Sequence, residues 1–137
     1  MYQIKSHTQR LRVSGLRSTK QRLAICKILF DRKETFHFTI EKLKKITDKV
    51  SKKKISRATL YNTVHAFTEK GFLKEITLRG CKTFFDTNIK HHHHFYDENM
   101  SRLVDIEEEN ISVNCLPKVP NGKKIKSVEV LVKIEKI

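Results

Sequence analysis

The sequence predicts an α+β fold in two domains, with helices and a β-hairpin in the N-terminal part and mostly strands in the C-terminal part. Two patterns carry this prediction. Segments before residue 72 combine capping residues with apolar residues at helical spacing, whereas segments after residue 91 alternate apolar and polar residues as strands do. We expect the first domain at 1–85, a hinge at 86–91 and the second domain at 92–137.

The first helices are predicted by caps and by apolar spacing. Residues 1–14 are polar and basic, and we interpret them as a short helix or an arm that ends at Gly15. The segment at 18–22 offers a helix cap, and the broad apolar face of residues 23–30 predicts a buried helix. The next helix starts near Thr39 and carries four apolar residues at helical spacing: Ile40, Leu43, Ile46 and Val50.

A further helix follows Ser56, an N-cap candidate, and ends at Gly71. The side expected to pack on the other helices carries Leu60, Val64 and Phe67. The opposite side, flanked by Arg57 in the first turn, carries Ala58, Tyr61, Asn62 and His65. A purely structural surface helix more often presents Lys and Glu, so this short, polar face with one aromatic residue is a candidate contact surface.

Two short strands at 73–76 and 82–85, with a turn at Gly80, predict a β-hairpin after the third helix. Three helices followed by a basic hairpin is the order of elements in a winged helix. In that fold the third helix enters the major groove of DNA, and the hairpin lies beside the phosphate backbone. We therefore assign DNA contact to Arg17, Lys20, Arg57, Thr59, Tyr61 and Asn62.

The chain is strongly basic, with 29 Lys and Arg against 15 Asp and Glu, a formal net charge of +14 and a pI near 9.9. This balance is typical of nucleic-acid binders, and the winged-helix order favours double-stranded DNA. Because charge alone is not specific, a basic protein associated with RNA or the ribosome is an alternative. The lysines at 52–54 are expected in a solvated loop that adds phosphate contacts near duplex DNA.

Membrane and disulfide proteins are two classes that the composition argues against. No apolar stretch approaches the roughly 20 residues of a membrane span, and the N-terminus lacks the apolar core of a signal peptide. We therefore expect a soluble, cytoplasmic protein without a membrane partner. Cys26, Cys81 and Cys115 form no C-x-x-C pair, which argues against a disulfide framework and a zinc knuckle. Cys26 is expected in a helix among apolar neighbours.

The C-terminal part is expected to contain four strands, at 92–96, 102–106, 111–115 and 125–134. The last of them alternates well, with one face formed by Val128, Val130, Val132 and Ile134. A module of roughly 50 residues cannot bury much apolar surface alone. We therefore expect it to complete its core by forming a homodimer.

Four consecutive histidines, residues 91–94, indicate a metal site. Imidazole and carboxylate suit Fe, Mn and Zn, and Asp86 and Asp105 lie just before and after the run. In an extended run, alternate side chains share a face, so His92 pairs with His94 and His91 with His93. Expression tags sit at chain ends, whereas this run lies inside the chain, so two candidate half-sites are predicted.

Several stretches resemble the ferric uptake regulator superfamily: residues 15–22, 37–43, 55–73 and 86–94. The resemblance covers the chain from residue 15 onward. It implies a dimeric, metal-dependent transcriptional regulator, usually a repressor, with an N-terminal winged-helix DNA-binding domain and a C-terminal α/β dimerisation and metal-sensing domain. The tail from Asn110 to the final strand resembles the iron response regulator branch.

The resemblance places the family's regulatory metal ligands on both domains, at His37, Asp86, His92, His94 and Asp105. Because these ligands are nitrogen and oxygen, Fe(II) or Mn(II) is favoured in the cell, with zinc as a candidate in vitro. A metal held by both domains would fix the angle of two winged helices on a duplex. DNA binding would then depend on metal.

The signal that the site senses stays open. An aspartate at position 105 resembles the peroxide-sensing type, in which bound Fe(II) reacts with peroxide and oxidises ligand histidines. Iron, haem and peroxide, the last with a role in oxidative stress, are therefore all candidate signals.

The chain also departs from the family pattern in three ways. Where relatives carry a C-x-x-C pair for structural zinc, this chain has Asp97 and Met100, which argues against that zinc. At a second family site His91 and His93 are present, but the remaining ligand positions fall on Ser112 and Val128. A second metal and haem are both candidates for these histidines. An N-terminal Cys-Pro haem motif is absent.

An alternative hypothesis, from another class of function, is a metalloenzyme that uses the histidines for hydrolysis. Such an enzyme needs an open coordination position and a positioned general base. The nearby carboxylates are already assigned as ligands, and no H-E-x-x-H helix occurs in the sequence. We therefore expect a regulator and not an enzyme.

Overall fold

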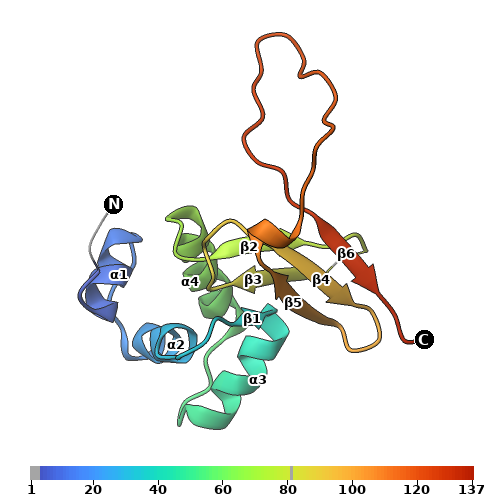
Figure 1. The fold of residues 1–137 in the computed structure, drawn as a ribbon. Helices are drawn as coiled ribbons and strands as arrows, with labels where there is room; N and C mark the ends of the chain where they lie inside the picture. The colour runs from blue at the N-terminus through green and yellow to red at the C-terminus, as the bar shows by residue number, and fades with distance from the viewer. Residues whose placement is uncertain (1–3, 81) are drawn as a thin grey trace. The chain divides into compact units, whose positions relative to one another are not determined.

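The computed structural model describes residues 4–80 and 82–137, and the chain divides into two compact units, Met1–Ile89 and Lys90–Ile137 (Figure 1). The first unit contains four α-helices and a small sheet, and the second contains a sheet with a short 3-10 helix. This is the α+β class that the sequence predicts. None of the helices in the described ranges combines the length and the apolar character that a membrane crossing requires.

Each helix of the first unit begins at a hydroxyl cap. The helices are α1 (His7–Val13), α2 (Lys20–Phe30), α3 (Ile40–Val50) and α4 (Arg57–Glu69). Their caps are Ser6, Thr19, Thr39 and Ser56, and each side chain accepts a hydrogen bond from the backbone N–H three residues on. The predicted helix starts near Thr39 and Ser56 are confirmed. Gly71 follows α4 at a φ of 83°, a conformation that glycine adopts without strain.

The helices pack around one apolar core. Leu60, Val64 and Phe67 of α4 are fully buried, as their spacing predicts. The Phe67 ring meets Phe30 edge-on, with the ring centroids 5.5 Å apart. Val50 continues the apolar spacing of α3 but is exposed, because it is the last residue of that helix. Thr47 is buried on α3 instead, where its hydroxyl donates to the Lys44 carbonyl.

The predicted hairpin is confirmed and forms part of a three-stranded antiparallel sheet. Its strands are β2 (Lys74–Thr77) and β3 (Thr83–Asp86), and β1 (His37–Phe38) pairs with the other edge of β3. The turn contains Gly80 at a φ of 97°; Cys81 lies outside the described residues. The sequence did not predict β1, since two residues are too short for a strand pattern.

The second unit is a three-stranded sheet of β4 (His93–Asp97), β5 (Arg102–Ile106) and β6 (Leu131–Ile134). The central strand is β4, which runs antiparallel to β5 and parallel to β6. The turn after β4 is closed by Asp97, whose carboxylate accepts from the backbone N–H groups of Asn99 and Met100. Asp97 and Met100, the positions where the resemblance implies a C-x-x-C pair, therefore belong to a hydrogen-bonded turn in this chain.

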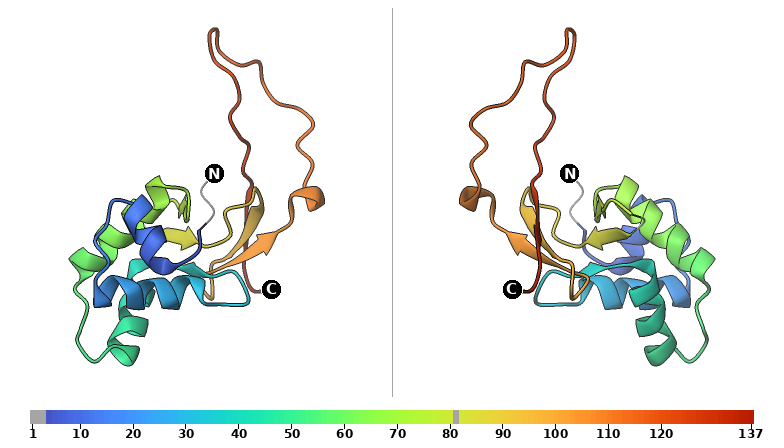
Figure 2. Two further views of the ribbon diagram at one scale, coloured as in Figure 1. Left: turned by 90° about the vertical axis from the view of Figure 1, so that its left-hand side faces the viewer. Right: turned by 90° about the vertical axis from the view of Figure 1, so that its right-hand side faces the viewer.

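Two predictions for this unit are wrong. Residues 111–115 form no strand, and the last strand begins at Leu131 rather than 125. The 3-10 helix η1 (Glu108–Asn110) is followed by a long loop, orange to red in Figure 1, that leaves and returns to the same sheet in both views of Figure 2. A strand needs a neighbour to pair its backbone groups. The described single copy provides none for 111–115.

Candidate metal centre and nucleic-acid interface

The histidine run enters β4 with the alternation that an extended chain imposes. The rings of His92 and His94 lie together, with their centroids 4.4 Å apart, and those of His91 and His93 are 5.2 Å apart. The expected division of the run into two faces is thereby confirmed. Three of these side chains, His92, His93 and His94, are buried.

His92 and His94 meet Asp105 from the neighbouring strand. His94 lies opposite Asp105 in the β4–β5 register, so strand pairing sets this contact. Oδ1 of Asp105 is 3.1 Å from Nε2 of His92 and 3.3 Å from Nε2 of His94. One donor atom from each of the three residues lies within 4.8 Å of the others. We call these three residues the sheet triad.

The hydrogen bonding of His92 suits metal coordination. Its Nδ1 is 2.6 Å from the carbonyl oxygen of Lys90, which can only accept, so Nδ1 carries the proton. In the neutral ring the lone pair is then on Nε2, the nitrogen that faces Asp105 and that would coordinate a metal. A backbone carbonyl that fixes the tautomer in this way is the usual support of a metal-binding histidine.

The first unit holds a second donor set, which we call the strand pair. His37 on β1 and Asp86 on β3 are register partners, and Nε2 of His37 is 3.1 Å from Oδ2 of Asp86. Asp86 is fully buried, and its Oδ1 accepts from the backbone N–H of Asn88. Imidazole and a hydrogen-bonded carboxylate are the donors that Fe(II), Mn(II) and Zn(II) accept. The residues of the triad and of the pair therefore fit a metal chemically.

His91 and His93 are engaged within the second unit. Nε2 of His91 donates to the Val128 carbonyl at 3.0 Å, and its Nδ1 is 3.1 Å from the Glu108 carboxylate. Nδ1 of His93 accepts from the backbone N–H of Val130, and burial lowers the pKa of His93, with His91 adding to the effect. A metal or haem at these rings would have to replace those hydrogen bonds. Sequence reasoning missed Glu108, although it lies in a visible acidic run.

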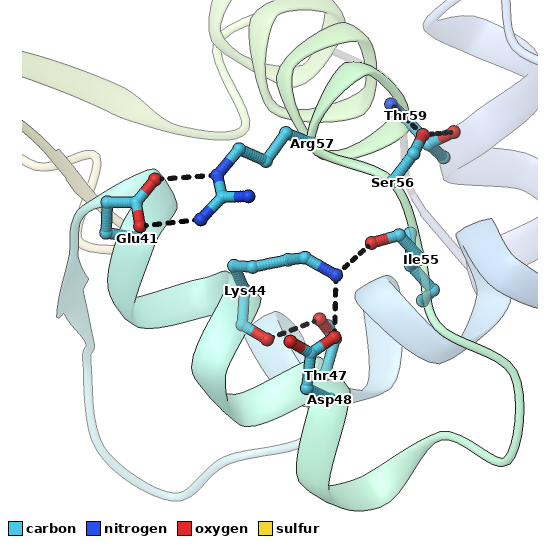
Figure 3. A network of polar contacts seen from close by, with 8 residues as sticks. All are labelled: Glu41, Lys44, Thr47, Asp48, Ile55, Ser56, Arg57 and Thr59. Carbon is cyan, nitrogen blue, oxygen red and sulfur yellow. Dashed lines mark hydrogen bonds and ion pairs between the residues drawn. The ribbon is translucent and has the colours of Figure 1, made fainter.

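The polar face of α4 lies on the surface, as the helical spacing predicts. Tyr61 is 58% exposed, and Ala58, Asn62 and His65 are also exposed. Thr59 is half-buried, with its hydroxyl 3.0 Å from that of the cap Ser56. Arg57, the first residue of the helix, is also exposed and pairs with Glu41 of α3 (Figure 3).

The other two basic residues assigned to DNA lie at the start of α2. Arg17 and Lys20 are exposed there. A hollow of about 340 Å³ beside them is lined by Thr8, Arg12, Leu16, Arg17, Ser18 and Thr19. Arg12 was not singled out from the sequence, because its neighbours along the chain do not reveal that α1 and α2 meet here.

A helical unit with a hairpin, followed by a sheet that carries a histidine–aspartate donor set, is the architecture of metal-responsive DNA-binding regulators. A sequence profile of the Ferric uptake regulator family matches residues 13–134, so the chain belongs to this family. The resemblance stated from the motifs is confirmed. Members of the family are transcription regulators, not enzymes; they bind DNA and are generally dimeric.

Individual proteins agree with this assignment. The chain is 32% identical over 97 residues to the peroxide-responsive repressor PerR of Staphylococcus aureus, covering 71% of this chain and 64% of the relative. It thus spans a little under two thirds of that protein.

Two solved structures share the fold. The Vibrio cholerae ferric uptake regulator matches with a TM-score of 0.70 at 19% identity, over 94% of this chain and 98% of that one. The Pseudomonas aeruginosa ferric uptake regulator, solved with manganese, matches with a TM-score of 0.66 at 16% identity, over 95% and 97%.

Proposed function

We propose that this protein is a metal-dependent, DNA-binding transcriptional repressor that acts in the cytoplasm as a homodimer on duplex operator DNA. The observation that carries the proposal is the presence of histidine–carboxylate donors in both units. The sheet triad offers His92, His94 and Asp105, and the strand pair offers His37 and Asp86. The sheet triad fills half of the roughly six positions of an octahedral metal, and the strand pair would supply two more.

One metal held by both sets would couple metal binding to DNA binding. A ligand shifts a conformational equilibrium only by its different affinity for the two states. A metal that takes ligands from both units favours the arrangement in which the two sets meet. We place the DNA-binding domain at 1–85, the hinge at 86–91 and the dimerisation and metal-sensing domain at 92–137, so this arrangement also sets the angle of the winged helices.

The proposed metal is Fe(II) or Mn(II). All five proposed ligands are imidazoles or carboxylates, and thiolates, which favour zinc, are absent from this set. The manganese described for the Pseudomonas aeruginosa regulator supports the same choice. Zinc is a competitor in vitro, because it also binds nitrogen and oxygen ligands tightly.

The proposed DNA contacts divide into base readers and phosphate binders. The exposed face of α4 would enter the major groove, with Arg57, Tyr61 and Asn62 near base edges. Thr59, in the first turn of the same helix, would contact the sugar-phosphate backbone of the DNA. Arg17 lines a hollow just before α2, and Lys20 is the first residue of that helix. Cationic side chains and the N–H groups of a helix start would favour a phosphate there.

The proposed dimer surface includes the long loop of the second unit. Apolar side chains lie exposed on it, among them Val113, Leu116 and Ile125. Val128 and Val130 are half-buried and continue the alternation into β6. Pairing with a second copy would supply the strand partner that 111–115 lacks in the single chain.

The test of the proposed function is DNA affinity with and without metal. The purified chain without a tag is incubated with a random-sequence duplex library in Mn(II), and the enriched duplex is compared with a shuffled duplex. We expect Mn(II) to strengthen binding to the enriched duplex, and EDTA to reverse the effect. A hydrolase would instead show substrate turnover, and a general RNA-binding protein would show DNA binding that does not respond to Mn(II).

Peroxide sensing at the same site is the second candidate, favoured by Asp105 and by the peroxide-responsive relative. Fe(II) bound there would supply the one-electron chemistry that reacts with peroxide. The histidines that would bind this iron are His37, His92 and His94. Because oxidised histidines bind metal poorly, their oxidation would weaken metal binding and release the DNA. Mass spectrometry of the iron-loaded protein after peroxide should then show added oxygen on these histidines, and the manganese-loaded protein should not. Haem capture by His91 and His93 is the alternative for an iron-linked signal.

A further inference from the structure

Helix α3 holds the first residue of α4 through a two-bonded ion pair. The Glu41 carboxylate accepts from Nε of Arg57 at 2.9 Å and from Nη2 of Arg57 at 3.0 Å (Figure 3). The two hydrogen bonds are parallel, which fixes the orientation of the guanidinium plane. Glu41 itself lies in the first turn of α3.

The pair is not explained by stability. Both side chains are more than half exposed, at 58% for Arg57 and 65% for Glu41. Exposed ion pairs contribute little to the free energy of folding, since water screens the charges and two long side chains lose freedom. The hydrogen bonds do act on the charges, because they lower the pKa of Glu41 and raise the pKa of Arg57.

Glu41 leaves one edge of the Arg57 guanidinium available for a further pair of hydrogen bonds. A guanidinium has five N–H groups, and the side formed by Nε and Nη2 is occupied by Glu41. Its opposite edge, formed by Nη1 and the second hydrogen of Nη2, can still donate two parallel bonds. Two parallel donors of this kind match O6 and N7 of guanine in the major groove.

The backbone before Arg57 is also held by α3. Nζ of Lys44 donates to the Ile55 carbonyl at 2.8 Å and to the Asp48 carboxylate at 2.7 Å (Figure 3). Ser56 then caps α4 by accepting from the N–H of Thr59. The backbone of this turn and the side chain of Arg57 thus both make contacts with α3, and these contacts favour one orientation of the guanidinium.

We propose that Glu41 is a specificity-determining positioning residue, which aims Arg57 at a guanine of the target duplex. The inference rests on the proposed DNA-binding function and deepens it. It assigns Glu41 two opposite effects. As a positioner it favours the correct sequence, and as a negative charge beside phosphates it weakens binding to every sequence.

The experiment compares variants of the full chain with Mn(II) on the enriched duplex and on the shuffled duplex. For Glu41→Ala we expect the ratio of the two affinities to fall about tenfold, the scale of one two-bonded base contact. Affinity for the shuffled duplex should rise slightly, with a steeper salt dependence, because one negative charge is gone. Glu41→Asp keeps the charge but shortens the arm, so the ratio should fall while shuffled-duplex affinity and salt dependence stay unchanged.

Two controls separate positioning from charge and from folding. Glu34→Ala removes another exposed carboxylate of the first unit and should leave the ratio unchanged. The Arg57→Lys variant keeps the positive charge but lacks the planar guanidinium. In that background Glu41→Ala should cause no further fall in the ratio of enriched-duplex to shuffled-duplex affinity. Thermal unfolding should be unaltered in the Glu41 variants.

The outcomes distinguish this inference from the function on which it rests. Wild-type protein that enriches no sequence from the library overturns both together. Wild-type protein that discriminates, with Glu41→Ala discriminating equally well, overturns only the role of Glu41. An equal loss on both duplexes also overturns it, since that result reports a structural defect and not the reading of a base.

Discussion

His37 lies directly across from Asp86 in the β1–β3 ladder, and Nε2 of His37 is 3.1 Å from the buried carboxylate. The two residues come from distant parts of the chain and meet because a two-residue strand adds to the edge of the hairpin. A donor pair fixed by backbone register costs little further ordering when a metal binds. Backbone pairing in the first unit thus holds two of the proposed ligands side by side.

Removing one member of the sheet triad should abolish most metal binding. We expect His92→Ala and Asp105→Ala each to weaken Mn(II) binding by at least about tenfold, because each deletes a direct ligand. The protein should remain a folded dimer. Isothermal titration with Mn(II), together with light scattering, measures both properties. His65→Ala is the matched control, since His65 lies exposed on α4, and unchanged Mn(II) affinity in His92→Ala would falsify the site assignment.

Removing His37 should separate metal binding from its effect on DNA. The ligands of the second unit remain in His37→Ala, so part of the Mn(II) affinity should survive. The increase in DNA affinity on adding Mn(II) should be smaller than in the wild type. The reason is that the metal no longer favours the arrangement in which ligands of both units bind it. Mn(II) titrations and DNA titrations on His37→Ala and His92→Ala, side by side, make the measurement. The coupling mechanism fails if His37→Ala keeps the full metal-induced change in DNA affinity.

Tyr61 should read bases, and the lysine loop should not. We expect Tyr61→Ala to weaken binding to the enriched duplex by about 1–3 kcal/mol, with a much smaller change on shuffled DNA. Lys53→Ala, in the exposed loop before α4, should weaken both duplexes equally and reduce the salt dependence. Fluorescence anisotropy over a range of salt concentrations distinguishes the two patterns. Equal losses on both duplexes for Tyr61→Ala would show that its ring contacts only the backbone.

The core of the first unit should depend on Phe67. Its ring is fully buried and meets Phe30 and Phe72 edge-on. Phe67→Ala should lower the free energy of unfolding by about 3–5 kcal/mol, through lost burial and the cavity left behind. Val50→Ala, at the exposed end of α3, should change it by no more than about 0.5 kcal/mol. Urea unfolding followed by circular dichroism tests the contrast, and similar losses for both variants would contradict this core.

Cys26 should react much more slowly than Cys115. Burial raises the pKa of Cys26 to about 11, so its thiol stays protonated at neutral pH, whereas Cys115 is exposed. Iodoacetamide at pH 8, followed by peptide mapping, should label Cys115 first and Cys26 only on unfolding.

The same shift predicts a stability change at high pH. The folded pKa of Cys26 lies above the ordinary value of 9.0, so the stabilising effect of the neutral thiol is complete below pH 9. It should decline as pH rises from 9 toward 11, because the unfolded chain loses this proton first. Cys26→Ser should lack that component when unfolding is compared at pH 8 and pH 10.5. In the iodoacetamide experiment, equal labelling rates for Cys26 and Cys115 in the folded protein would contradict the burial of Cys26.

The sequence by itself determined the helices of the first unit and the faces of the histidine run. Thr39 and Ser56 cap their helices through contacts only three residues long, and the sides of α4 follow from its repeat. The pairing of His92 with His94 follows from the alternation of an extended chain. Such features depend on neighbours in the chain, so they can be predicted without the fold.

Only the tertiary structure decided which distant residues meet. Glu41 reaches Arg57 because α3 and α4 pack together, and Glu108 reaches His91 because η1 follows β5. The strand expected at 111–115 is a loop because strand pattern alone does not form a strand; its backbone must find a partner. Contacts of this kind depend on the packing of whole elements, and local residue preferences are too weak to specify them.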